Sequence, residues 1–302
     1  MNPPAQQPRT AAVIKGQIRT ADSLKGLMMP QSHRLCRLEN NGYLVMRCLL
    51  SLSVLVASTI PMLPVRADPT GQPGACSETQ TGTYLIVSEG QRAGKPVGRL
   101  QLENWAADGS VSGSRFLRLG KTYSETRYSG RWERLSGCAL SVTRDSDGSS
   151  SNVLLTPQGL PRFGISTRPG DVVTERWIQQ PRGRCTPGGM NGTVLSLQRG
   201  LSFSRDEWTS NVVIQQETWN DWNMVGLAVS SYAGAGEVAA YQGRFTQDDN
   251  CIGRIRQQDA RGVTYSYVAI LRSDGGGYAY LQTQGDDLTV ALLERVSAGS
   301  GP

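Results

Sequence analysis

Tyr128-Ser-Gly-Arg-Trp132 and Tyr241-Gln-Gly-Arg-Phe245 are two copies of one pattern, and this pattern decides the fold. Each copy places an aromatic residue on both sides of a Gly-Arg pair and is followed by a cysteine, Cys138 or Cys251. The copies lie 113 residues apart. Because recurrence at a fixed spacing is typical of a repeated structural unit, the flanking sequence should recur as well.

The recurrence extends along most of the chain. Gly82-Thr-Tyr-Leu85 returns as Gly192-Thr-Val-Leu195, Val111-Ser-Gly113 returns as Met224-Val-Gly226, and Gly170-Asp-Val-Val-Thr174 returns as Gly285-Asp-Asp-Leu-Thr289. The offsets between matching positions vary only from 109 to 115 residues. The sequence therefore indicates an internal duplication of a unit of about 110 residues.

Four of the six cysteines fall at matching places in the two repeats: Cys76, Cys138, Cys185 and Cys251. Four cysteines allow three pairings. The duplication favours Cys76–Cys138 and Cys185–Cys251, because a single ancestral unit would have had to close its own bridge. Such bridges are expected in an oxidising compartment, so we interpret these cysteines as structural disulfides.

Short strands, separated by turns rich in Gly, Pro, Asn and Asp, are predicted throughout both repeats. The first repeat has predicted strands at 82–88, 97–104, 110–119, 122–134, 138–144, 150–156, 160–167 and 171–178. The second has them at 192–198, 211–217, 223–231, 238–247, 251–258, 262–271, 277–283 and 287–296. No segment has helical periodicity. Eight strands per unit favour an up-and-down barrel or a sandwich, and a barrel also removes free sheet edges.

A single sixteen-stranded outer-membrane barrel is the alternative. Such barrels need strands of about 9–11 residues with an apolar outer band and aromatic girdles. Several predicted strands are shorter, and the chain has only four Phe. The duplicated cysteines also fit two closed units better, so we predict an all-β fold with two tandem eight-stranded antiparallel barrels.

The first repeat also resembles a group of exported bacterial domains of unknown function. The resemblance rests on Gly82-Thr-Tyr-Leu85, on the segment from Gly98 to Ser114, on Arg127-Tyr-Ser-Gly-Arg-Trp132 and on Gly137-Cys-Ala-Leu-Ser-Val-Thr143. It covers residues 76–180 and, more weakly, 185–296. It implies export and a small barrel of lipocalin or allene-oxide-cyclase-like shape, and it carries no agreed activity. The second copy departs from the pattern, since Val194 replaces the first-strand aromatic residue and Trp219-Asn-Asp-Trp222 replaces the Asp-Gly turn.

The first 67 residues carry the whole net charge of +6. The remainder is neutral and has no single-sign field to attract nucleic acid, so nucleic acid is not expected as a partner. Residues 46–67 combine a basic start, an apolar run at 48–60 and a small-residue exit at Ala67, as in a signal peptide. This run is too short for a stable membrane span. We therefore expect cleavage after Ala67 and a periplasmic or secreted protein.

Much common enzyme chemistry is missing from the mature chain. The single histidine, His33, precedes the expected cleavage site. This removes Ser-His-Asp and Cys-His nucleophilic sites, histidine-ligated zinc and the commonest general base at neutral pH. We predict no catalytic residues, no metal site and no cofactor. A hydrolase or cyclase that uses paired carboxylates stays open as a lower-ranked alternative.

Two sets of residues are candidates for ligand binding. Arg131 and Arg244 recur beside an aromatic residue and could anchor an anion, because guanidinium suits bidentate pairing. Trp208, Trp219 and Trp222, with Tyr241, could stack on a sugar or an apolar ligand. Each also has a structural interpretation, as a folding residue or as the filling of a barrel end. An eight-stranded barrel is just wide enough to be filled or to hold one small ligand.

These observations predict an exported, non-catalytic protein that binds a small, partly apolar ligand. The alternative is an envelope structural or interaction protein whose filled barrels contact protein or glycan. The predicted organisation is an extension or misassigned start (1–45), a signal peptide (46–67), a leader (68–75), the first barrel (76–180), a linker (181–184), the second barrel (185–297) and a tail (298–302).

Overall fold

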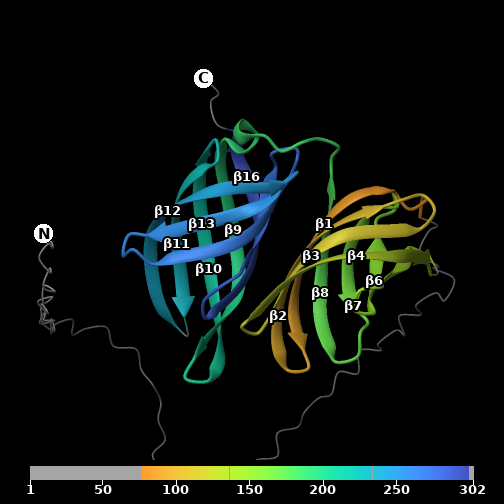
Figure 1. Ribbon diagram of the computed structural model, residues 1–302, viewed down its shortest axis with the longest axis horizontal. Coiled ribbons are helices and arrows are strands. Elements are labelled where there is room, and N and C mark those ends of the chain that lie inside the picture. Colours follow the sequence, from red (N-terminus) through yellow and green to blue (C-terminus); the bar gives the residue numbers. More distant parts are fainter. Residues whose placement is uncertain (1–75, 136, 233, 299–302) are drawn as a thin grey trace, which may run out of the picture. The chain divides into compact units, whose positions relative to one another are not determined.

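The computed structural model describes residues 76–135, 137–232 and 234–298 (Figure 1). The predicted extension, signal peptide and leader lie outside these residues. The described residues form sixteen strands and one short 3₁₀ helix, η1 (Pro187–Met190). None of their helices has the length and apolar character needed to cross a membrane. The strands make two closed eight-stranded antiparallel barrels, which confirms the predicted fold class.

The first barrel is an up-and-down barrel in which each strand pairs with the next along the chain. Its strands are β1 (Gly82–Arg92), β2 (Lys95–Trp105), β3 (Ser110–Leu119), β4 (Thr122–Arg134), β5 (Ala139–Arg144), β6 (Ser149–Leu155), β7 (Pro161–Ser166) and β8 (Asp171–Gln180). The pairing of β1 with β8, from Thr83↔Gln180 to Arg92↔Asp171, closes the barrel. Closure leaves the sheet without an unpaired edge.

The second barrel repeats this topology. Its strands are β9 (Gly192–Ser204), β10 (Glu207–Asn220), β11 (Asn223–Tyr232), β12 (Ala235–Asp249), β13 (Ile252–Asp259), β14 (Thr264–Leu271), β15 (Gly277–Gln282) and β16 (Asp287–Ala298). Here β16 closes onto β9, with Asp287 opposite Ser202 and Glu294 opposite Leu195.

The hairpin between β9 and β10 is longer than the sequence predicts. The prediction ends one strand at 198 and starts the next at 211, whereas β9 continues to Ser204 and β10 begins at Glu207. The turn residues Arg205 and Asp206 both have positive φ, 51° and 65°. Such a two-residue turn normally carries Asn or Gly, so its sequence gave no hairpin signal.

An apolar cluster fills one end of each barrel, next to its disulfide. Cys76 is joined to Cys138, and Cys185 is joined to Cys251, which is the pairing predicted from the repeated sequence pattern. In the first barrel the cluster includes Trp105 and Trp177. Loop closure over 62 and 66 residues corresponds to roughly 4 kcal/mol of stabilisation per bridge.

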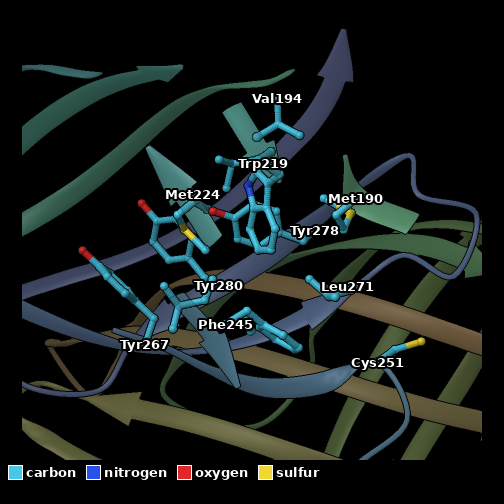
Figure 2. Packing of buried hydrophobic residues seen from close by; sticks show 14 residues of the cluster. Met190, Val194, Trp219, Met224, Phe245, Cys251, Tyr267, Leu271, Tyr278 and Tyr280 are labelled. Atoms are coloured by element: carbon cyan, nitrogen blue, oxygen red, sulfur yellow. The ribbon is translucent and has the colours of Figure 1, made fainter. Parts of the chain in front are cut away.

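The matching cluster in the second barrel is shown in Figure 2. Met190 of η1 covers this end of the barrel and packs with Trp219, Phe245 and Tyr278. The centres of the Trp219 and Tyr278 rings are 5.1 Å apart in an edge-to-face arrangement, a favourable geometry for aromatic pairs. The ends of both barrels beside the disulfides are therefore filled.

A third apolar cluster joins residues of both barrels. Outward-facing Leu85, Leu100 and Phe116 of the first barrel belong to it. Val268 and Ile270 of β14 contribute from the second barrel and are fully buried. Burial on the outer wall of a barrel explains why β14 and β15 are apolar on both faces.

Candidate functional site

The interiors of the two barrels can be compared position by position, because their strand registers match. Gly82 pairs with Trp105 as Gly192 pairs with Trp219. Gly130 likewise pairs with Arg144 at the place where Gly243 pairs with Gln257. This register makes Glu103 and Tyr128 the counterparts of Glu217 and Tyr241.

Buried ion pairs fill the middle of the first barrel. The Arg144 Nε atom lies 2.5 Å from Glu103 Oε1, and Arg99 Nη2 lies 2.5 Å from Glu175 Oε1. These four side chains are at most 1% exposed. Buried charges persist only when they are paired and hydrogen-bonded, and here each carboxylate has its own guanidinium.

Glu103 is the centre of this network. It accepts hydrogen bonds from Tyr128 Oη at 2.6 Å and from Trp105 Nε1 at 3.0 Å, besides its contact with Arg144. Burial alone would raise the pKa of Glu103, but the Arg144 charge and these donors outweigh it and hold the pKa below its ordinary value. The first barrel therefore has a charge-balanced, filled interior.

The second barrel has a carboxylate at the matching central position but no cation beside it. Glu217 stands where Glu103 stands, and Gln257 replaces Arg144. Four uncharged donors reach the Glu217 carboxyl: Tyr278 Oη at 2.6 Å, Tyr241 Oη at 2.8 Å, Trp219 Nε1 at 2.9 Å and Gln257 Nε2 at 3.0 Å. Burial raises the pKa of Glu217, and the hydrogen bonds only partly offset this.

The barrels also differ at one cross-strand pair, which lies on β7 and β8 in the first barrel and on β15 and β16 in the second. In the first barrel Gly164 lies opposite Glu175, and a Cβ on this glycine would meet the Glu175 and Trp177 side chains at 3.0 Å. In the second barrel the same pair is Tyr280 and Ala291. At this pair the large interior side chain of the first barrel is the Glu175 carboxylate on β8, whereas that of the second barrel is the Tyr280 phenol on β15.

These exchanges leave a cavity of about 80 Å³ in the second barrel, at the end away from the disulfide. Gln198, Gln215, Tyr241, Gln257, Tyr267 and Tyr280 line its inner part. Tyr232, Glu237, Asp259, Arg261, Tyr265 and Asp287 lie around its mouth. A cavity measured this way needs about 10–15 Å³ to hold one water, so this one has room for a small molecule.

Hydrogen bonds and ring packing fix the inner wall of the cavity. The Tyr280 hydroxyl lies 2.9 Å from Gln198 Oε1 and 2.8 Å from Gln215 Oε1. The Tyr267 and Tyr280 rings are adjacent, with centres 4.5 Å apart (Figure 2). A wall held by such contacts is preorganised, which favours ligand binding because little order has to be created.

Two of the six predicted ligand-binding residues meet at the central carboxyl. Tyr241 and Trp219 both donate to Glu217, and Tyr241 also lines the cavity. Trp222 packs on Phe245, with ring centres 5.2 Å apart, at the filled end. Trp208 packs on Phe203 in the long β9–β10 hairpin.

The two predicted arginines lie away from the cavity. Arg131 on β4 and Arg244 on β12 are both exposed. Neighbouring residues on a strand point to opposite faces, and on β12 the inward set contains Tyr241 and Phe245. The structure does not bring these arginines together with the tryptophans.

Sequence reasoning missed Glu217 and the phenols of Tyr267 and Tyr280. A signal for the first was present, because Glu103-Asn-Trp105 recurs as Glu217-Thr-Trp219 at the strand ends. The phenols had no such signal, since the first barrel has Ser151 and Gly164 in their places.

An apolar patch lies on the outer wall of the second barrel. Leu195, Leu197, Ile214, Leu227 and Val229 are outward-facing, and Leu197 is 77% exposed. Contiguous exposed apolar surface of this kind often marks an interaction site. Among the described residues, no group of three or more His, Cys, Asp or Glu side chains is placed to hold a metal ion.

Comparisons with known proteins give only distant likenesses. No protein-family description matches the chain, and no curated protein matches it. A porin-like protein from Bacteroides uniformis is 10% identical, with 74% of this chain and 99% of that chain covered and a TM-score of 0.21. An AttH-like protein from Nitrosomonas europaea is 8% identical, with 74% and 98% covered and a TM-score of 0.24. Likenesses at this level identify no family.

Proposed function

We propose that this protein is an exported, non-catalytic binding protein whose second barrel holds one small, partly apolar ligand. The observation that carries the proposal is the cavity of the second barrel, at the place where the first barrel is filled by buried ion pairs. Tyrosine rings, Val213 and Ala228 supply apolar wall, while Gln198 and Gln215 supply a few polar groups. This combination is typical of small-molecule sites.

The difference between the barrels supports separate roles for them, with ligand binding in the second barrel only. We infer that both descend from one lipocalin-like module by tandem duplication, and that the first copy serves mainly as a stable scaffold. In the first copy, Arg99 and Arg144 form ion pairs with the buried carboxylates of Glu175 and Glu103. The second copy exchanged these charges for phenols and amides, which can bind a ligand without first breaking an ion pair.

Native mass spectrometry of the protein purified from its own source tests the binding function. A retained small molecule is expected on the wild-type chain. Ala228→Leu, which fills the cavity wall, should abolish it, whereas Ala240→Leu on the exposed face of β12 should not. A wild-type protein without any adduct, or an adduct that both variants keep, would count against the proposal.

Export itself has a direct test. We propose a periplasmic or secreted protein, because residues 46–67 have the composition of a signal peptide and two disulfides need an oxidising compartment. The mass of the protein from its source should correspond to a chain that begins at Asp68 and has no free thiol. An intact segment before Ala67 would contradict this.

The outer apolar patch favours a second function, contact with an envelope protein. A photo-crosslinking amino acid at Leu197 should capture a protein partner in source cells, because this side chain projects from the patch. The matched control is Leu154, which is also exposed, on the outer wall of the first barrel. Equal yields at the two positions, or none at Leu197, would remove this second function.

A further inference from the structure

The two barrels differ most in the charges that face their interiors. Four arginines of the first barrel point inward and contact carboxylates or neighbouring polar groups. They are Arg92, Arg99, Arg115 and Arg144, and at the same register positions the second barrel has Ser202, Val213, Ala228 and Gln257. None of the four replacements carries a positive charge.

Two of the carboxylates that these arginines neutralise are kept. Glu103 has its counterpart in Glu217, and Asp171, which Arg92 binds at 2.9 Å, has its counterpart in Asp287. Asp287 accepts a hydrogen bond from the Ser202 hydroxyl at 2.6 Å in place of the guanidinium. The second barrel has therefore lost positive charge around acids that it retains.

The residues that line the mouth of the cavity include more carboxylates than arginines. Glu237, Asp259 and Asp287 line it together with Arg261. Arg261 binds Glu237 at 2.5 Å and Asp259 at 2.8 Å, so its charge is already shared between two carboxylates. An anionic ligand would meet a surplus of negative charge here, whereas a cation would be attracted.

The tyrosines add an independent preference for a cation. In the first barrel the Arg115 guanidinium lies over the Tyr128 ring, 4.8 Å from its centre. Tyr241 is the matching tyrosine, and its neighbour at the Arg115 position is Ala228, so no guanidinium covers its ring from this place. The faces of Tyr rings attract ammonium and guanidinium groups, and Tyr265 and Tyr267 border the same cavity.

A buried acceptor beside Asp287 lacks a donor. The Asn211 side chain, 3% exposed, donates to the Ser202 hydroxyl at 2.6 Å, and that hydroxyl donates to Asp287. Its own carbonyl oxygen has no hydrogen-bond partner among the described residues. A buried acceptor without a partner is costly, but Asn211 does not line the cavity. The hydrogen bonds from Asn211 to Ser202 and from Ser202 to Asp287 instead fix the position of the Asp287 carboxylate at the cavity mouth.

We propose that the cavity of the second barrel takes a small organic cation, an alkylammonium or alkylguanidinium compound, whose charged group lies over the Tyr241 ring where the first barrel has the Arg115 guanidinium. This inference rests on the proposed binding function and specifies its ligand class. The short alkyl part of the ligand packs against Val213 and Ala228, and its charge is balanced by the mouth acids, chiefly Asp287.

Isothermal titration calorimetry of the full mature protein tests the charge preference. The cationic probes are choline and n-butylguanidinium. Their neutral isosteres, 3,3-dimethylbutan-1-ol and n-butylurea, have nearly the same shape, and butyrate tests an anion. Each cation should bind at least tenfold more tightly than its isostere, and butyrate should not bind. Equal affinities for cation and isostere, tighter binding of butyrate, or no binding of either cation would overturn the inference.

Two test substitutions and one control locate the effect. Asp287→Asn should weaken choline binding about fivefold, the contribution of one partly exposed ion pair. Asp221→Asn is the matched control, since it removes the same charge from an exposed turn at the other end of β10, and it should not change affinity. Ala228→Arg restores the guanidinium of the first barrel and should abolish cation binding. If that variant does not fold by circular dichroism, Asp287→Asn still decides, because an unchanged affinity there would overturn the inference.

The outcomes of these experiments distinguish a failure of this inference from a failure of the proposed binding function. Retention of a neutral or anionic ligand in native mass spectrometry, together with equal binding of choline and its isostere, leaves a binding protein with a different ligand class. The absence of any retained ligand, with no effect of Ala228→Leu, removes the binding function itself.

Discussion

Glu103 and Glu217 occupy the same place in two barrels of the same topology, yet their surroundings differ in charge. A guanidinium lies against the first, and only phenol, indole and amide donors reach the second. Since a buried carboxylate keeps its charge only if neighbours stabilise it, one residue, Arg144 or Gln257, decides the electrostatic surroundings of each of these two carboxyls.

Replacing each carboxyl by its amide isostere should therefore have unequal effects. Glu103→Gln leaves the Arg144 guanidinium buried without its partner, which typically costs about 3–5 kcal/mol. Glu217→Gln leaves no charge uncompensated, and Gln257 can turn its amide to match, so we expect a loss of about 1 kcal/mol. Urea unfolding of both variants measures the free energies, and equal losses would contradict the assignment of charges.

The two carboxyls should also respond to pH in opposite directions. The pKa of Glu217 is raised by burial above its ordinary 4.5, so its folded form binds more protons than the unfolded chain. Its stabilising contribution is full below about pH 4.5 and falls as the pH rises through the folded pKa. The pKa of Glu103 is lowered despite burial, because Arg144 outweighs it, so its contribution is full above pH 4.5 and is lost on acidification.

Unfolding free energies measured between pH 3 and pH 8 check this. The stability difference between the wild type and Glu217→Gln should shrink towards pH 8, whereas the difference for Glu103→Gln should shrink towards pH 3. Parallel curves for the two variants would show that the carboxyls titrate alike and would contradict the comparison of the barrels.

At the scale of the elements, a glycine under a tyrosine recurs on the second hairpin of each barrel. Gly113 of β3 lies opposite Tyr128 of β4, and Gly226 of β11 lies opposite Tyr241 of β12. A Cβ on Gly226 would lie 2.4 Å from the Tyr241 ring. The glycine therefore lets the ring lie flat across the strand and bring its hydroxyl to Glu217.

Gly226→Ala should displace the Tyr241 ring and break its hydrogen bond with Glu217. Overpacking of this kind costs about 1–3 kcal/mol, and ligand binding should weaken in parallel because Tyr241 lines the cavity. Gly236→Ala on β12 is the control, since a Cβ there meets nothing within 4 Å, and its effect should stay within about 0.5 kcal/mol. Thermal unfolding followed by circular dichroism compares the two, and equal shifts would contradict this role of Gly226.

The elements were predictable from sequence to the extent that local chemistry specifies them. Alternating side chains and glycine turns located every strand, and the recurrence of the sequence pattern indicated the pairing of Cys76 with Cys138. The Arg205–Asp206 turn was missed because its positive φ values are imposed by the hairpin rather than by turn residues. The cavity was missed because it arises from cross-strand exchanges, such as Gly164 for Tyr280, that become visible only once the register is known.

At the scale of the whole molecule, contacts between the barrels decide whether they behave as one cooperative unit. Arg118 of β3 is fully buried, and it donates to the carbonyl oxygens of Gln282 at 3.3 Å and Gln284 at 3.1 Å and to that of Gly285. These carbonyls belong to the end of β15 and the turn before β16. A first-barrel side chain thereby holds a turn that borders Asp287, at the mouth of the second-barrel cavity.

Arg118→Ala should therefore loosen a segment of the other barrel. Hydrogen bonds from a charged donor contribute about 1.5–3 kcal/mol each when buried, and their loss leaves carbonyls of the turn without donors. Hydrogen–deuterium exchange of amides 282–287 should accelerate at least tenfold, while amides of β10 keep their protection. Arg127→Ala, an exposed arginine on the neighbouring strand β4, should leave both segments unchanged. If exchange at 282–287 were the same in wild type and Arg118→Ala, the two barrels would be energetically independent there, and the cavity mouth would owe its order to the second barrel alone.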